Sequence, residues 1–144
     1  MQEWHNFLVG GLGVVVHNNY GVLQNIIDGI SDATKQYHKK YMCKEYGTAL
    51  REYLIQNGEA NPKAVIFRLF DMNGNRAQMR IYHNGEEIAT NGLHVGTPIN
   101  GKMFDNMNPN GMDVDEWLSK FEYPPHLKLK PDVIDASQVI NSFY

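Results

Sequence analysis

The fold that the sequence predicts is decided by one stretch, Asn91-Gly-Leu-His-Val-Gly-Thr-Pro-Ile-Asn-Gly-Lys-Met-Phe-Asp105. Its centre, Asn100-Gly101, is a strong signal for a two-residue β-hairpin turn, because both positions tolerate positive φ. His94 begins the first flanking β segment and Asp105 ends the second, so an antiparallel hairpin would bring the two side chains together. A carboxylate beside an imidazole fixes the tautomer of a base. The pair is therefore the candidate base of an active site.

The composition is typical of one globular domain. The chain has 144 residues, of which 42% are hydrophobic and 20% charged, and its net charge is -3. A chain of this length buries roughly 70% of its surface. Its acidic balance gives no reason to expect nucleic-acid binding, and no apolar run reaches the roughly 18 residues of a membrane span. We expect no nucleic acid and no membrane among its partners.

Cys43 is the one cysteine of the chain, which excludes an intramolecular disulfide framework and a multi-cysteine zinc site. A lone cysteine with a distant histidine is a candidate nucleophile. The apolar pattern predicts a helix from Cys43 to about Gln56, and the positive end of a helix dipole favours a thiolate. The alternative is that Cys43 is a small buried hydrophobe, as most free cysteines are.

The remaining patterns predict an α+β domain, with N-terminal helices packed on an antiparallel sheet. Apolar spacing predicts a helix over 20–38. Alternating segments and Asn-Gly turns predict that 64–70, 77–82 and 87–90 form one meander with the 94–105 hairpin. We expect a loop at 106–111 and either an edge strand or an extended arm at 127–130. A capping box, Asp113 with Glu116, predicts a helix over 114–121, and Asp135 should cap a last helix. His83, beside a turn, is expected to be exposed.

Residues 1–18 look unlike the rest of the chain. Composition alone predicts a small β-ribbon. However, His5-Asn-Phe-Leu-Val-Gly10 and Gly13-Val-Val-Val-His-Asn18 resemble the last two sequence blocks of intein-like Hint domains of the pretoxin type. The resemblance implies that 1–18 is a C-terminal Hint remnant and that 19–144 is the domain it releases. In that family the terminal His-Asn cleaves the chain, a role that would fall to His17 and Asn18.

Three later segments resemble papain-fold toxin domains of bacterial polymorphic toxins. They are Cys43-Lys-Glu-Tyr-Gly-Thr-Ala-Leu, Gly92-Leu-His94-Val and Gly101-Lys-Met-Phe-Asp-Asn-Met-Asn-Pro-Asn-Gly111, followed by Trp117. The resemblance covers about 41–121 and implies a papain-like cysteine hydrolase fold with a Cys43, His94 and Asp105 triad. It implies no cofactor. A metal site at these three residues is disfavoured, because they leave no established fourth ligand.

The same resemblance implies a function but leaves the substrate open. Papain-fold toxins act as proteases, glutamine deamidases or transglutaminases through an acyl-enzyme, and we expect a deamidase acting on proteins. A cysteine protease or transglutaminase is the alternative, and a non-catalytic protein-binding module is an alternative of another class. The resemblance further implies secretion or delivery within a larger toxin, action in the target-cell cytoplasm, and a cognate immunity protein.

Overall fold

The computed structural model describes residues 21–141, which form helices followed by two antiparallel sheets. The chain starts with α2 (Gln24–Asp28), α3 (Ile30–Ala33), the 3-10 turn η1 (Lys35–Tyr37) and α4 (Cys43–Gln56). A five-stranded sheet has the order β6-β5-β4-β1-β8, and a three-stranded sheet has the order β3-β2-β7. The strands are β1 (Lys63–Phe70), β2 (Ile81–His83), β3 (Glu86–Ala89), β4 (Leu93–Ile99), β5 (Lys102–Asp105), β6 (Asn108–Asp113), β7 (Phe121–Glu122) and β8 (Lys128–Asp135). The short elements α5 (Val114–Ser119) and η2 (Ala136–Gln138) complete the α+β fold.

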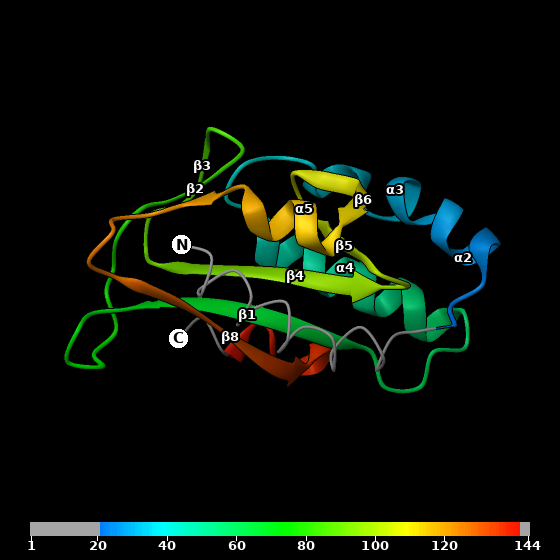
Figure 1. Cartoon of the computed structure of the whole chain (residues 1–144). Coiled ribbons are helices and arrows are strands. Elements are labelled where there is room, and N and C mark those ends of the chain that lie inside the picture. The colour runs from blue at the N-terminus through cyan, green and yellow to red at the C-terminus, as the bar shows by residue number, and fades with distance from the viewer. Residues whose placement is uncertain (1–20, 142–144) are drawn as a thin grey trace.

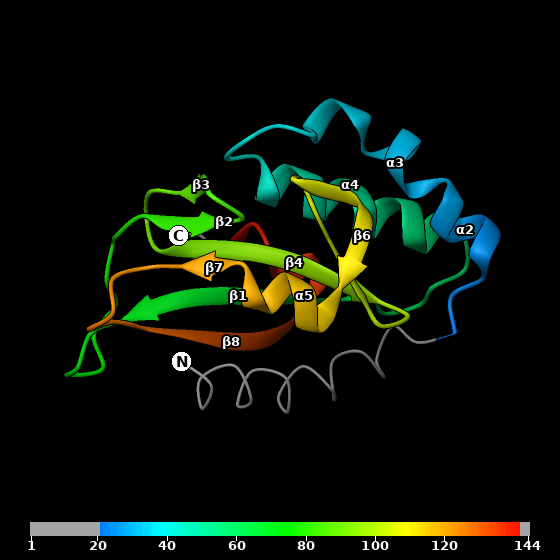
Figure 2. The same ribbon diagram turned by 45° about the horizontal axis from the view of Figure 1, so that its top comes forward.

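Helices cover both faces of the large sheet, with α4 and α5 on opposite sides (Figures 1 and 2). Successive side chains of a strand point to opposite faces. In β1, Val65 and Phe67 accordingly pack in the cluster that contains Trp117 of α5, whereas Ile66 packs in the cluster that contains Cys43 of α4. The inner strands β1 and β4 are therefore buried on both faces, whereas the outer strands β6 and β8 remain partly exposed. No helix within residues 21–141 is both long and apolar enough to cross a bilayer.

The hairpin that organises the sequence forms as predicted. Strands β4 and β5 pair in antiparallel register, with Thr97 opposite Phe104. The turn residues Asn100 and Gly101 have φ values of 50° and 83°, as a two-residue turn of this kind requires. The Asn100 side chain also donates to the Val22 carbonyl oxygen at 2.7 Å, which fastens the turn to the start of the described chain.

The single helix predicted over 20–38 is wrong, because the helix is interrupted at Gly29. The Tyr53 hydroxyl of α4 donates a 2.6 Å hydrogen bond to the Ile26 carbonyl oxygen, which a continuous helix would use for Ile30. A Cβ at Gly29 would lie 2.2 Å from that hydroxyl oxygen. Glycine therefore lets α4 pack closely enough to break the helix.

The single meander is also wrong, because β1 pairs with β4 and β8 while β2 and β3 belong to the second sheet. Residues 71–75 instead form a tight loop, in which the Asp71 carboxylate accepts from the backbone N–H groups of Asn73 and Asn75. Residues 77–80 are not a strand, and the predicted loop at 106–111 contains most of β6. Of the two alternatives for 127–130, the edge strand is confirmed, since 128–130 begin the eight-residue outer strand β8. Side-chain alternation marks a strand but does not name its partner.

The two predicted helix caps had different outcomes. Asp113 precedes α5, but its side chain makes no capping hydrogen bond. Asp135 does cap the chain that follows, since its carboxylate accepts from the Ser137 N–H at 2.9 Å. The capped element is a single 3-10 turn, shorter than the helix that was predicted.

Candidate active site

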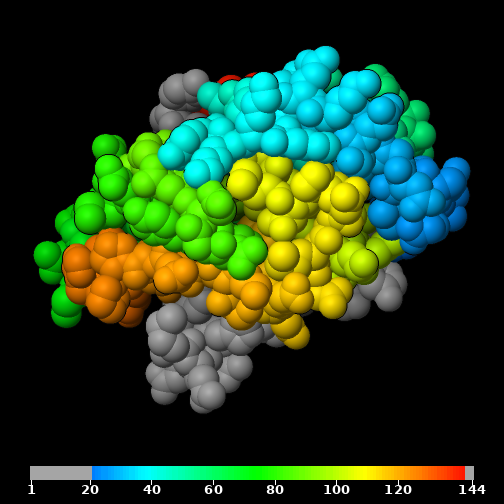
Figure 3. Space-filling view, turned by 90° about the horizontal axis from the view of Figure 1, so that it is seen from above, coloured from blue at the N-terminus to red at the C-terminus, as the bar shows by residue number. Residues whose placement is uncertain are grey.

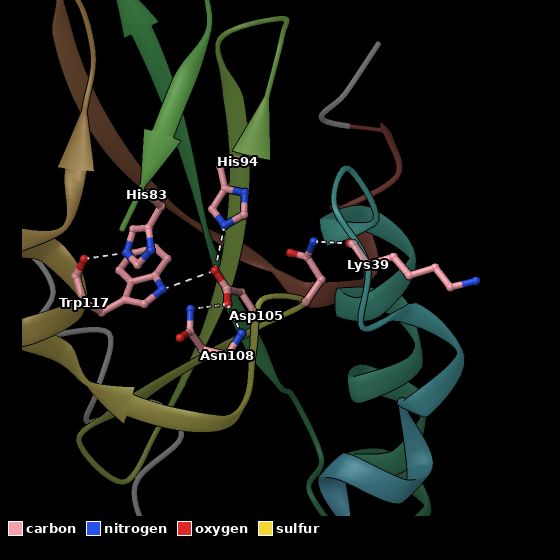
Figure 4. Close-up of polar contacts among 7 residues, drawn as sticks. Lys39, His83, His94, Asp105, Asn108 and Trp117 are labelled. Carbon is pink, nitrogen blue, oxygen red and sulfur yellow. Dashed lines mark hydrogen bonds and ion pairs between the residues drawn. The ribbon is translucent and has the colours of Figure 1, made fainter. Parts of the chain in front are cut away.

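His94 and Asp105 meet as the hairpin predicts. The His94 Nε2 atom lies 2.9 Å from Asp105 Oδ2, and both side chains are completely buried (Figure 4). Continuing the β4–β5 register by one pair sets Asp105 opposite Gly96, so His94 is its diagonal neighbour on the same face of the hairpin. Nε2 carries the proton of this bond when Asp105 is ionised, which leaves Nδ1 as the nitrogen available for chemistry.

Asp105 is held by hydrogen bonds to both of its oxygens. Besides His94, Oδ2 accepts from Trp117 Nε1 at 3.2 Å. Oδ1 accepts from the backbone N–H and the side-chain amide of Asn108, at 2.8 and 2.9 Å. Burial raises the pKa of the Asp105 carboxyl, but the hydrogen bonds and charge of its neighbours outweigh it and lower the pKa. Asp105 is therefore a fixed, ionised partner for the imidazole.

Trp117 places an aromatic surface against the same histidine. Its ring lies nearly parallel to the His94 ring, at 28° and a centroid distance of 6.0 Å. The absence of a side chain at Gly96 makes room for this packing, because a Cβ there would lie 2.8 Å from Met103 Sδ and 3.4 Å from Trp117 Cζ2. Trp117 was part of the family resemblance, but its hydrogen bond to Asp105 and that of Asn108 had no sequence signal of their own.

Cys43 is the first residue of α4, is 4% exposed, and is near enough for its charge to act on the same imidazole. Burial lowers the pKa of His94, whereas the charge of Cys43 and the hydrogen bond to Asp105 raise it, so that the pKa reaches about 10. Nδ1 has no hydrogen-bond partner of normal geometry in this conformation. Cys43 therefore lies near the ring without a hydrogen bond to Nδ1. The structure brings together all three residues that the sequence singled out.

His83 differs from its prediction as an exposed loop residue. Its side chain is buried, and Nε2 donates to the Trp117 carbonyl oxygen at 2.7 Å. Burial lowers the pKa of His83, so the ring is neutral near neutral pH. The turn at Asn84-Gly85 lies at the surface, but β7 covers the preceding residue by pairing with β2. His83 therefore packs against the Trp117 ring and hydrogen-bonds to the Trp117 backbone.

The donors for a developing oxyanion are those of the α4 N-terminus. The first N–H groups of a helix have no partner within it, and Cys43 supplies one of them. The two side chains near enough in sequence to assist are not arranged to do so. Gln36 is exposed in η1, and His38 Nε2 is 3.0 Å from the Thr34 hydroxyl.

A surface pocket of about 200 Å³ opens beside the cysteine. Its walls come from the start of α4, from the end of β3, from the loop after β3 and from the first residue of β4, and they include Tyr41, Cys43, Glu45, Ala89, Thr90 and Asn91. A larger hollow of about 630 Å³ adjoins it through Thr90 and is lined by Met79, Tyr82 and Tyr123 among others. Of the three residues in question, Cys43 alone lines the pocket, so a bound group would meet the sulfur first.

Two further predictions concern the processing residues near the N-terminus and the binding of a metal ion. His17 and Asn18, assigned to processing, lie outside the described residues. Within residues 21–141, no three His, Cys, Asp or Glu side chains are grouped so that they could hold a metal ion.

Comparison with known proteins identifies the family. A family model described as papain fold toxin 2 matches residues 25–122, which is more than half of the chain. The match includes Cys43, His94, Asp105 and Trp117. No curated protein and no solved structure matches the chain. The chain therefore belongs to the papain fold toxin 2 family.

Proposed function

We propose that this toxin domain is a cysteine hydrolase that deamidates glutamine side chains of proteins, with Cys43 as nucleophile, His94 as acid and base, and Asp105 as the group that orients His94. One observation carries the proposal. A buried imidazole, bonded through Nε2 to an ionised carboxylate at 2.9 Å, has the thiol of a helix N-terminus beside its remaining edge. This is the arrangement that activates a cysteine for acyl transfer.

In the acylation step the Cys43 sulfur, as thiolate, attacks the carboxamide carbon and forms a C–S bond. The oxyanion that develops receives a hydrogen bond from the Cys43 backbone N–H. His94, as imidazolium, gives its Nδ1 proton to the amide nitrogen, which leaves as ammonia. The raised pKa of His94 supports this role, since the ring then holds its proton at neutral pH.

In the deacylation step a water molecule enters where ammonia has left. Neutral His94 takes a proton from the water through Nδ1, while the oxygen attacks the thioester carbon. The thiolate is expelled, the substrate leaves as glutamate, and the thiolate–imidazolium pair is restored. Asp105 stays ionised and stabilises the imidazolium in both steps, as the carboxylate of a triad does.

The surroundings of Cys43 support an amide side chain on a protein as the substrate. The pocket is small, contains Glu45 and Asn91 as polar groups, and suits one extended side chain better than a bulky one. The adjoining hollow, with its apolar lining, offers a place for neighbouring residues of a polypeptide. Proteolysis and transglutamination would use the same acyl-enzyme, so the identity of the product decides among the three.

Mass spectrometry of bacterial lysate exposed to the protein tests the proposal, with Cys43→Ala as the matched control. We expect glutamine residues to gain about one dalton with the wild type only. Cut backbones would favour a protease, and glutamine–lysine crosslinks a transglutaminase. If Cys43→Ala keeps both its fold and its toxicity, the protein is a binding module and the hydrolase proposal is wrong.

We further propose that the domain acts in the cytoplasm of a target cell after delivery within a larger toxin, and that a cognate immunity protein covers the Cys43 pocket. In the parent, the Hint-like segment would cleave after Asn18, with His17 protonating the departing peptide. N-terminal sequencing of released toxin tests the cleavage, because Asn18→Ala should abolish release at that bond. Growth on co-expression with the neighbouring gene product tests the immunity protein.

A further inference from the structure

The chain leading into α4 contains a strained residue. Tyr41 has a φ of 69°, which is a rare value for a bulky side chain. Such a conformation persists only where the surroundings hold it in place. The Tyr41 side chain is 52% exposed, so burial in the core does not hold it. Its polar contacts are the remaining candidates.

Two polar contacts join the stretch before α4, residues 39–41, to β3. The Tyr41 hydroxyl donates to Glu87 Oε1 at 2.6 Å, and Lys40 Nζ lies 2.8 Å from Glu86 Oε2. The side chains of Lys40 and Glu86 are about half exposed, and water competes for contacts of this kind. Figure 3 shows the cyan stretch that includes these residues lying against the green segment of β2 and β3.

The preceding residue is anchored differently. The Asn106 side-chain amide donates to the Lys39 carbonyl oxygen at 2.6 Å, and Asn106 is 1% exposed. This bond is partly buried on the side of Asn106, whereas the contacts of Lys40 and Tyr41 are at the surface. The stretch is thus held by one partly buried hydrogen bond at Lys39 and by two exposed contacts at Lys40 and Tyr41.

This arrangement lies at the mouth of the candidate active site. Tyr41, Cys43 and Ala89 of β3 line the same pocket. Cys43 is only 4% exposed and His94 is fully buried, so a protein amide cannot reach both in this conformation. We propose that Lys40 and Tyr41, fastened to Glu86 and Glu87, form a latch over the Cys43 pocket that must open before a protein substrate reaches the sulfur. The proposal rests on the proposed role of Cys43 as nucleophile.

Alkylation of Cys43 by iodoacetamide tests the latch without any substrate, and the signal is unambiguous because the chain has one cysteine. Tyr41→Phe removes the hydroxyl and leaves the charge near Cys43 unchanged. We expect its alkylation rate to exceed that of the wild type by about 1.5-fold to fivefold, the size of effect that an exposed polar contact supports. Equal rates in the two proteins would overturn the latch.

Two controls make the result specific. Tyr37→Phe removes the hydroxyl of another partly exposed tyrosine, which does not line the Cys43 pocket, and should leave the rate unchanged. Tyr41→Phe combined with Glu87→Ala should alkylate no faster than Glu87→Ala alone, because each change by itself already removes the Tyr41–Glu87 hydrogen bond. Independent, multiplying effects would contradict a shared latch.

The pH profile of alkylation separates access from reactivity. An open latch raises the rate in Tyr41→Phe by the same factor at every pH, whereas a changed thiol shifts the profile along the pH axis, and such a shift would count against the latch. The proposed function fails independently, if Cys43→Ala retains toxicity. A working hydrolase with equal alkylation rates in wild type and Tyr41→Phe would refute the latch alone.

Discussion

The two sides of the candidate active site are built in different ways. On the hairpin side, Asp105 is 1% exposed and accepts four hydrogen bonds, one of them from His94. On the side of β3, Lys40 and Tyr41 are held by contacts that water reaches. Buried polar networks are rigid and costly to break, whereas exposed pairs contribute little. The comparison indicates that the candidate base, His94, is held rigidly, whereas the segment of Lys40 and Tyr41 at the pocket mouth can change conformation.

The largest effect should come from removing the centre of the buried side. Asp105→Ala leaves His94 and Trp117 with unpaired buried donors, so we expect the protein to lose about 3–5 kcal/mol of unfolding free energy. Activity should fall by roughly 10⁴-fold, because the tautomer of His94 is no longer fixed. Urea denaturation and product mass spectrometry measure the two losses. Near-wild-type stability would mean that the network is not rigid, and the contrast between the two sides would disappear.

Trp117→Phe tests the same side more gently. It removes the indole N–H that reaches Asp105 and part of the surface against His94 while keeping an aromatic ring. We expect a loss of about 2–3 kcal/mol from the lost hydrogen bond and the cavity. His94 and Asp105 remain in place, so activity should drop by about tenfold, far less than in Asp105→Ala. Phe121→Leu is the control, because Phe121 packs in the same cluster but makes no hydrogen bond to Asp105. It should lower the free energy of unfolding and leave the pH dependence of the activity unchanged.

The pH dependence of stability sharpens the comparison further. The folded pKa of His94 is raised from 6.5 to about 10, so its stabilising contribution is complete below pH 6.5 and is lost as the pH rises through about 10. The folded pKa of Asp105 is lowered, so its contribution is present above its ordinary value of 3.8 and is lost as the pH falls through the lowered value. Thermal melts across pH should show both losses of stability, an alkaline limb from His94 and an acid limb from Asp105. In Cys43→Ala the alkaline limb should begin at lower pH, because one charge that raises the pKa of His94 is gone.

The smallest effect should come from the exposed side. Lys40→Gln breaks the ion pair to Glu86, and both side chains are about half exposed. We expect no measurable change in the urea midpoint, in contrast to Asp105→Ala. A large loss of stability in Lys40→Gln would show that this side is as rigid as the other.

The sequence predicted the parts of the site that depend on local chemistry. The Asn100-Gly101 turn required positive φ at two positions, and it set the strand register that places His94 near Asp105. The helix from Cys43 to Gln56 followed from its apolar face and has the predicted bounds. The order of the predicted helices and strands indicated the α+β class, and the family resemblance added the papain-like fold.

The parts that depend on contacts between distant segments could not be predicted. Nothing local to residues 20–38 reveals that the Tyr53 hydroxyl takes a carbonyl of that helix. The exposure of His83 was misjudged because β7, about 40 residues later, covers it. The Asn108 and Trp117 bonds to Asp105 likewise depend on where β6 and α5 fold back.

The free edges of the sheets have a consequence for how the protein behaves in a crowded solution. The outer strands of the five-stranded sheet, β6 and β8, contain Pro109 and Pro131, and proline has no N–H to offer a further strand. The outer strands of the smaller sheet, β3 and β7, have only four and two residues. Long, regular edges are templates on which chains aggregate. Interrupted and short edges therefore protect the folded domain against growth into intermolecular sheets, even where many copies are produced together.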